Sequence, residues 1–247
     1  MRPYLGLALP IAAAALTLVC MREASACGLT PPIGPSGLAT VCHGDSTPRV
    51  HAGLSAGGTS TSIRFPNGRA ELLQGASVLA IDVNPLVGTF AEPLTVSLTA
   101  GASLGGHVDY AGARYTLSQG AVVGGGLAYR FGGRGGAPFV QPSLSLAYAG
   151  LAKAEGPDGR RESFNAIDYR AGLAVGKVVG GFAAPFAVVR YFGGGTDWEV
   201  AGGNGRDRFL YHAGVGSAFA LGQQLVLVAE VAFIGERRAT VGVGWSF

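Results

Sequence analysis

The sequence predicts an all-β fold: an antiparallel transmembrane β-barrel of ten strands, with eight as the alternative, after a cleaved signal peptide. Three features support this prediction, namely strictly alternating apolar residues, few charges, and a final strand that ends in an aromatic residue. Charged residues make up 13% of the chain, about half the share usual in soluble domains, and 42 of the 247 residues are glycine. The composition therefore disfavours both an ordinary soluble enzyme and a helical membrane protein.

The first 26 residues have the organisation of a secretory signal. Arg2 supplies positive charge, residues 5–19 form an apolar core, and the small residues 24–26 precede a cut at Cys27. The apolar core is shorter than the ~20 residues that a membrane anchor needs. We therefore expect a signal peptide over 1–26, a short periplasmic segment over 27–47 and the barrel over 48–247.

Two cysteines, Cys27 and Cys42, remain after cleavage, in a compartment that favours disulfides. A bridge between them is the favoured interpretation, and loop closure makes it worth ~3 kcal/mol. Acylation of Cys27 is the alternative, which the polar residues 22–23 disfavour. A zinc site lacks ligands because only His43 is near, and a c-type haem site lacks a cysteine because Ala39 occupies its place. We therefore predict no metal and no cofactor.

The net charge is too small to indicate an anionic partner. The chain carries 18 Lys and Arg against 15 Asp and Glu, a formal net charge of +3, of which one unit leaves with the signal peptide. Nucleic-acid-binding domains are strongly basic, so we expect no nucleic-acid partner.

Alternation with a period of two residues marks the strands. From Leu94 to Leu104 apolar residues alternate with Thr, Ser or Gly without exception, and a β-strand has this period. Residues 167–175, 209–219 and 225–233 repeat the pattern. An even number of strands is expected for a single-chain bacterial barrel. The ten expected strands are roughly 48–58, 69–83, 93–104, 119–131, 138–152, 164–178, 183–193, 206–220, 223–234 and 238–247.

The connections between these strands alternate in character. Those after strands one, three, five and seven are long and polar, and we expect them to be external loops; most of the others are shorter and rich in Gly or Pro. The connection after strand nine is short although it should be external, and the first two strands have the weakest pattern, which keeps eight strands as an alternative. The four expected external loops are 59–68, 105–118, 153–163 and 194–205.

The other face of the strands is expected to line a narrow lumen. It carries Gly, Ala and a few charges, which is too little polar surface for the exterior of a soluble sandwich. Charges inside a narrow lumen must pair, so we expect a network that fills the interior or lines a narrow polar pore, with solute binding as the alternative. The predicted lumen charge network comprises Arg130, Asp168, Arg170, Arg208, His212 and Glu230, and Arg49, His51 and Arg190 share its face.

Two classes of barrel enzyme have motifs that can be compared with this chain. Omptin proteases use an Asp-x-Asp pair and an Asp-x-His pair, where this chain has Asp82-Val-Asn84 and Leu210-Tyr-His212. Barrel lipid A deacylases use a His-Ser step, and no histidine here is followed by Ser. We therefore predict no catalytic residue and a protein that is not an enzyme.

The last eight residues form an amphipathic strand. Val241, Val243, Trp245 and Phe247 are apolar and alternate with small or polar residues. The segment resembles the C-terminal signal by which bacterial outer-membrane barrels are handed to their assembly machinery. The residues that carry this resemblance are Thr240, Gly242, Trp245 and Phe247.

From about residue 48 onward, the chain resembles the small bacterial outer-membrane barrels grouped with the OmpA-like and OmpX-like barrel domains, through its strand pattern, glycine usage and C-terminal segment. The resemblance implies a multi-pass barrel of the outer membrane and a monomer. Its expected partners are outer-membrane lipids, lipopolysaccharide and the assembly machinery. The expected role is non-enzymatic, in envelope structure or surface interaction through external loops. A narrow porin-like channel is the alternative, and an enzyme acting on lipid A or peptides is less favoured.

Overall fold

The computed structural model describes residues 50–83, 94–133, 137–222 and 225–246. The predicted signal peptide, Cys27, Cys42 and Phe247 lie outside these residues. The described residues form antiparallel strands and one short 3-10 helix, η3 (Glu199–Ala201). The strands are β1 (Val50–Phe65), β2 (Gly68–Val83), β3 (Leu94–Tyr110), β4 (Ala113–Leu117), β5 (Gly120–Tyr129), β6 (Phe131–Gly132), β7 (Pro138–Glu155), β8 (Arg161–Lys177), β9 (Ala183–Trp198), β10 (Gly203–Asp207), β11 (Tyr211–Leu221), β12 (Leu225–Gly235) and β13 (Arg237–Ser246).

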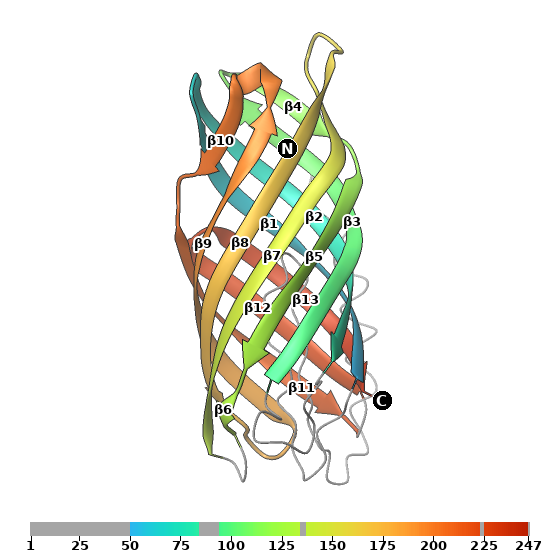
Figure 1. Cartoon of the computed structure of the whole chain (residues 1–247), viewed down its shortest axis with the longest axis vertical. Coiled ribbons are helices and arrows are strands. Elements are labelled where there is room, and N and C mark those ends of the chain that lie inside the picture. Colours follow the sequence, from blue (N-terminus) through green and yellow to red (C-terminus); the bar gives the residue numbers. More distant parts are fainter. Residues whose placement is uncertain (1–49, 84–93, 134–136, 223–224, 247) are drawn as a thin grey trace, which may run out of the picture.

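Ten of these strands close into a ring (Figure 1). The ring runs β1, β2, β3, β5, β7, β8, β9, β11, β12, β13, and β13 pairs back with β1 from His51↔Ser246 to Ser60↔Arg237. The predicted antiparallel barrel of ten strands is therefore confirmed. Closure pairs the edges of the first and last strands, so the backbone polar groups of both are satisfied inside the wall.

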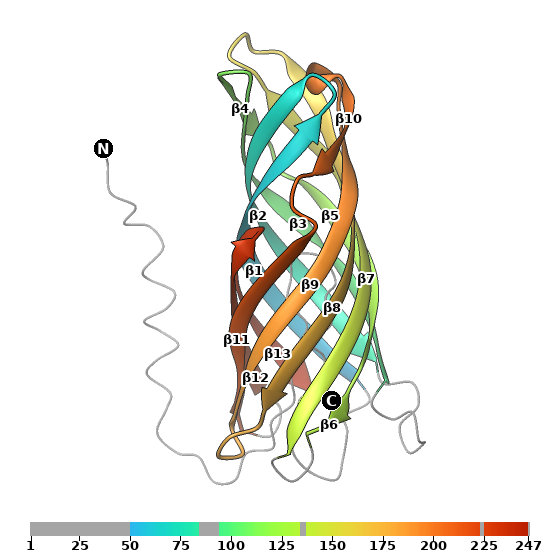
Figure 2. The ribbon, with the colours of Figure 1, turned by 90° about the vertical axis from the view of Figure 1, so that its left-hand side faces the viewer.

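The wall narrows toward its upper end. β12 and β13 form a hairpin that turns at Glu236, and above this turn β10 pairs with both β9 and β1. The wall therefore has ten strands in its lower part and eight in its upper part, and Figure 2 shows β10 above β11 in the upper part. This explains the short connection after the ninth predicted strand, because that hairpin ends partway up the wall.

The prediction of four long external loops is wrong. The strands continue through most of these segments, and turns at 66–67, 111–112, 156–160 and 199–202 join them at the upper rim (Figure 2). Register irregularities interrupt the wall just below, between Gly75 and Ala76 where β2 pairs with β3 and between Ala149 and Ala152 in β7. A bulge of this kind shifts the alternation of side chains by one residue, which made the continuing strands resemble loops.

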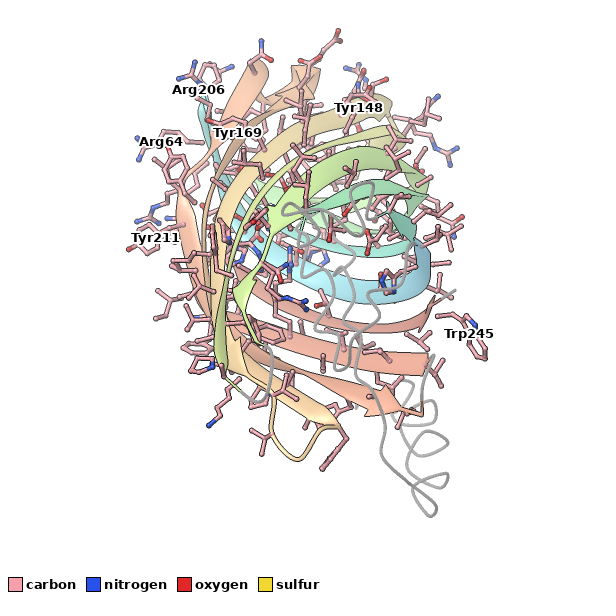
Figure 3. The ribbon with its side chains drawn as sticks, turned by 60° about the horizontal axis from the view of Figure 1, so that its bottom comes forward. Arg64, Tyr148, Tyr169, Arg206, Tyr211 and Trp245 are labelled. Atoms are coloured by element: carbon pink, nitrogen blue, oxygen red, sulfur yellow. The ribbon has the colours of Figure 1, made fainter. Side chains whose placement is uncertain are left out.

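The outer surface of the lower part is an apolar band bounded by aromatic side chains. Tyr211 and Phe219 mark its two edges on β11, and eight residues of strand span about 27 Å along the chain. A strand tilt of about 40° reduces this to about 20 Å, close to the apolar height of outer-membrane barrels. The exposed upper residues, called the tyrosine belt here, are Tyr148, Tyr169, Tyr191 and Tyr211, and the exposed lower ones are Phe131, Phe182, Phe219 and Trp245. Tyr148, Tyr169, Tyr211 and Trp245 are labelled in Figure 3.

The tyrosine belt divides the barrel into two parts. We call the wall between the two aromatic edges the membrane section. We call the wall above the belt, residues 61–72, 106–117, 152–166 and 195–207, the neck. The first strand begins and the last strand ends at the lower end, which is the periplasmic end in barrels of this type (Figure 1).

Candidate functional site

A buried charge network crosses the lumen of the membrane section. Glu230 of β12 lies between two guanidinium groups and is itself almost fully buried. Arg190 of β9 donates to both of its carboxylate oxygens, with Nη2 to Oε2 at 2.8 Å, and Nη2 of Arg238 on β13 lies 3.2 Å from Oε1. These charge-assisted contacts on both sides of one carboxylate offset the cost of burying it.

The network continues through a second arginine centre. Nε of Arg170 on β8 donates to Oδ2 of Asp168 at 2.6 Å, and its Nη1 donates to Oε1 of Glu236 at 3.0 Å. Nη1 of Arg190 lies 3.0 Å from Nε2 of His212, which must act as the acceptor because a guanidinium only donates. His212 lies between the two centres, with its Nδ1 3.6 Å from Oε1 of Glu236, beyond hydrogen-bond distance. Three arginines and three carboxylates therefore balance within one buried layer.

The structure brings four of the predicted network residues together: Asp168, Arg170, His212 and Glu230. Arg208 does not join them. It is exposed on the outer face and its guanidinium lies 5.4 Å from the ring centroid of Phe209. The pattern treated 206–220 as one strand, whereas β10 ends at Asp207 and β11 begins at Tyr211, so the alternation changes phase between them. Arg130 lies half-buried between β5 and β6, near the periplasmic end.

Two members of the network were not predicted. Glu236 and Arg238 are buried in the lumen. Both share the even-numbered phase of Thr240 and Gly242. Arg238 lies within the predicted strand 238–247 although it was not assigned to the network, and extending that strand backward by two residues would have found Glu236. The predicted strands leave 235–237 as a connection, whereas the hairpin tip lies at the level of the network.

An aromatic cluster fills the lumen of the neck. Its centre is Trp198 at the end of β9, whose ring contacts Phe65, Tyr110, Tyr115 and Phe164 edge to face at centroid distances of 5.9, 5.5, 4.9 and 5.8 Å. Edge-to-face ring pairs add to the stability of the fold beyond the contribution of the apolar area that they bury. The smaller residues Ile63, Ala70, Val108, Leu117, Ala154 and Ala201 complete the cluster. We call this cluster the aromatic plug, because it occupies the outer end of the lumen.

A cavity of about 110 Å³ lies between the aromatic plug and the charge network. Thr61 and Thr196 line it together with Asp168, Asp207 and Glu236. The rest of the lining is largely apolar, and beside the polar side chains a space of this size can hold a few water molecules. Within the part of the chain that the structure describes, no group of three or more His, Cys, Asp or Glu side chains is arranged to hold a metal ion.

The periplasmic end of the lumen is also occupied by side chains. Phe139 and Phe186 pack with Val188, Val226 and other apolar residues in a second buried cluster. His51 and Asp82 face each other across β1 and β2, and both are buried. Side chains therefore fill the lumen at the plug, at the charge network and below it.

The predicted assembly residues have structural positions in the last strand. Thr240 is buried, and a Cβ on Gly242 would lie 2.9 Å from Cβ of Ser55, so the neighbouring β1 needs glycine there. Trp245 is exposed at the lower aromatic edge (Figure 3). Phe247 lies outside the described residues, and the recognition role of the segment stays a prediction.

The closed antiparallel ring, the outward apolar band and the charge-containing lumen define a transmembrane β-barrel of the outer-membrane type. In the described residues no helix is both long and apolar enough to cross a membrane. No protein-family model and no curated protein matches the sequence.

Solved structures resemble the chain in fold. Neisserial surface protein A (NspA) is 12% identical over 80% of this chain and 97% of its own, with a TM-score of 0.43. The translocator domain of the autotransporter NalP from Neisseria meningitidis is 13% identical over 82% and 90%, with a TM-score of 0.48. The β domain of the Bordetella autotransporter BrkA is 17% identical over 81% and 100%, with a TM-score of 0.46. These similarities concern the fold alone, and the OmpA-like or OmpX-like assignment stays a prediction.

Proposed function

We propose that the protein is a closed, non-enzymatic barrel of the outer membrane that acts in envelope structure and surface interaction through its neck. The observation that carries this proposal is the aromatic plug, because five aromatic rings meet where a channel would need an open mouth. The surface interactions that were expected of external loops are assigned to the neck in this proposal, because paired strands reach almost to the rim.

Two features of the lumen favour this proposal over a narrow porin-like channel. A solute that entered from outside would have to displace Trp198 from its ring contacts. It would then have to separate Glu230 from Arg190 and Arg238, which leaves charges unpaired in a desolvated layer. Both steps are costly, so the resting barrel is expected to be closed.

The positions of two histidines favour a non-enzymatic role. His212 is fully buried between Arg190 and Glu236, and His51 is buried at the opposite end of β1 from the rim, so neither imidazole can reach a substrate at the outer rim. A barrel enzyme acting on lipid A or peptides needs its acid or base group there. Among the described histidines, His107 lies in the neck, with Nε2 3.9 Å from Oδ2 of Asp109, and that carboxylate is paired with Arg114.

Conductance in planar bilayers tests the proposal. We expect the full-length protein to give no conductance, and we expect Trp198→Ala to give at most brief openings because the charge network remains. The control is Val200→Ala, a partly exposed position on η3 beside the plug. Steady conductance of the natural protein would establish the channel instead.

A further inference from the structure

A row of arginines crosses one side of the neck. Arg206 of β10 is paired in register with Arg64 of β1, and Arg64 is paired in register with Arg69 of β2. All three are exposed, and Figure 3 shows Arg206 and Arg64 pointing away from the lumen on the side of the barrel where Tyr211 lies. Three adjacent strands therefore present one arginine each at the same register position.

This row is unfavourable for the barrel on its own. Side chains that are directly opposite on neighbouring strands have Cβ atoms about 5 Å apart, and like charges at that separation destabilise the pair. Arg69 is compensated, since it contacts Glu71 and donates from Nε to Oγ of Ser62 at 2.7 Å. For Arg64 and Arg206, the described residues provide no carboxylate within salt-bridge distance.

Elsewhere in the neck, exposed arginines are paired with carboxylates. Arg114 makes a bidentate contact with Asp109 at 2.7 and 2.8 Å, and Nε of Arg161 lies 2.6 Å from Oε2 of Glu155. These pairs lie on β3, β4, β7 and β8, away from β10 and β1. Uncompensated positive charge is therefore concentrated on one side, over β10 and β1.

The same side carries two more exposed arginines closer to the membrane. Arg237 is paired in register with Ser60 at the tip of the β12–β13 hairpin, and the backbone N–H of Arg208 donates to the carbonyl of Ser62 at 2.9 Å. Tyr211 of the tyrosine belt lies three residues beyond Arg208, about 10 Å along the chain. We call these five residues, Arg64, Arg69, Arg206, Arg208 and Arg237, the arginine patch. The patch extends from the membrane boundary up the outer face of the neck.

We propose that the arginine patch binds the phosphate groups of an anionic outer-leaflet glycolipid, the phosphorylated lipopolysaccharide of the surrounding membrane. Guanidinium groups bind phosphate bidentately, and the patch begins at the level of the lipid headgroups. A bridging phosphate removes the repulsion between Arg64 and Arg206, which explains why the two stand opposite each other. The inference rests on the membrane placement of the barrel and is independent of whether the lumen is closed.

Lipid binding to the full-length barrel in nanodiscs of phosphatidylcholine tests this inference. Rough lipopolysaccharide is added, and the bound lipid is counted by native mass spectrometry. We expect the double variant Arg64→Gln/Arg206→Gln to bind about ten-fold more weakly than the natural protein, since two charge-assisted contacts are lost. The matched control is Arg114→Gln/Arg161→Gln, which removes the same charge from paired arginines and is expected to bind normally.

The chemical group is tested by removing phosphate from the lipid. Lipopolysaccharide dephosphorylated with hydrofluoric acid should bind the natural protein as weakly as the double variant binds the intact lipid. Equal binding of both lipids, or equal loss in the two double variants, would overturn the proposal. Displacement by millimolar inorganic phosphate would identify a free-phosphate site and would also overturn it.

A stability measurement covers the case in which the double variant folds poorly. In detergent without phosphate, Arg206→Gln alone should unfold at the same or a higher urea concentration than the natural protein, because it relieves repulsion. With lipopolysaccharide added, the natural protein should gain more stability than this variant. A single variant that is less stable in detergent and gains as much from the lipid would contradict the inference.

Discussion

The neck and the membrane section share six strands, β1, β2, β3, β7, β8 and β9, whose inner and outer faces exchange polarity between the two sections. On β1, Leu54 points outward in the membrane section and Ser55 points inward, whereas in the neck Arg64 points outward and Phe65 inward. The outer face of β2 shows the same change, since the exposed residue is Leu79 in the membrane section and Glu71 in the neck. An environment that is lipid below and water above accounts for this change, because each section places its apolar residues away from water.

The reversal shows how one barrel can be stabilised in two ways. The membrane section places its charges inside and must pair them, as Glu230 is paired with Arg190 and Arg238. The neck places apolar rings inside, as a small water-soluble barrel does, and needs only eight strands to enclose them. The two sections are therefore expected to respond differently to substitutions of the same kind.

The largest effect is expected inside the membrane section. Glu230→Ala leaves Arg190 and Arg238 without their shared carboxylate, and removing one partner of a buried pair costs about 3–5 kcal/mol. The measurement is urea unfolding in detergent. Glu199→Ala, in the exposed turn after β9, is the control and is expected to change stability little. Unchanged stability of Glu230→Ala together with a measurable conductance would mean that water reaches this layer.

A smaller and more local effect is expected inside the neck. Trp198→Ala removes the centre of the aromatic plug and should cost about 3 kcal/mol, at the lower end for such changes because the half-buried Tyr115 can move into the space. Hydrogen exchange should rise in residues 106–117 and stay unchanged in β12. Equal loss of protection in both regions would show that the two sections unfold as one unit.

Substitutions on the outer face should reveal the opposite environments. Leu98→Arg places a charge in the middle of the apolar band of β3 and should destabilise by about 2–4 kcal/mol in lipid. Thr116→Arg, at an exposed outward position of the neck on β4, should change stability by less than about 0.5 kcal/mol. Refolding into lipid bilayers against urea measures both. Equal destabilisation by the two substitutions would mean that Leu98 and Thr116 both face lipid or both face water.

The smallest effect concerns an exposed carboxyl of the neck. The hydrogen bond and the charge of Arg114, with a further contribution from His107, hold the pKa of Asp109 below its ordinary value of 3.8. Its contribution to stability is therefore present above the unfolded pKa and is lost as the pH falls through the lower folded pKa. NMR titration should show this depressed pKa, and Arg114→Gln should return it toward the ordinary value. A carboxyl of ordinary pKa in the natural protein would rule out the pairing in solution.

The strands of the membrane section could be predicted from the sequence because one physical pattern covers them. Apolar residues outside and small residues inside gave bounds near those observed, as at Leu94, Pro138 and Ala183. The neck could not be predicted in this way. Its strands keep the period of two with reversed polarity, and the bulges in β3 and β7 shift its phase, so polar residues such as Lys153 and Glu155 suggested loops.

The charge network was predictable only where the inward and outward alternation of side chains continues without interruption along a strand. Asp168 and Arg170 lie on β8, which keeps one phase from end to end, and both face the lumen. Arg208 was misplaced because the phase changes between β10 and β11. The aromatic plug was not predicted, because Trp198 and Phe65 lie in segments that were expected to be external loops.

The depth of outward residues tests the central claim most directly. Single spin labels at Leu144, Leu146, Lys153 and Arg161, in a background without the natural cysteines, report contact with lipid or water through their accessibility to oxygen and to a water-soluble nickel chelate. The reversal predicts lipid contact at Leu144 and Leu146 and water contact at Lys153 and Arg161, with the boundary at the tyrosine belt. Lipid contact at Lys153 and Arg161 would contradict the division of this barrel into a membrane section and an extracellular neck.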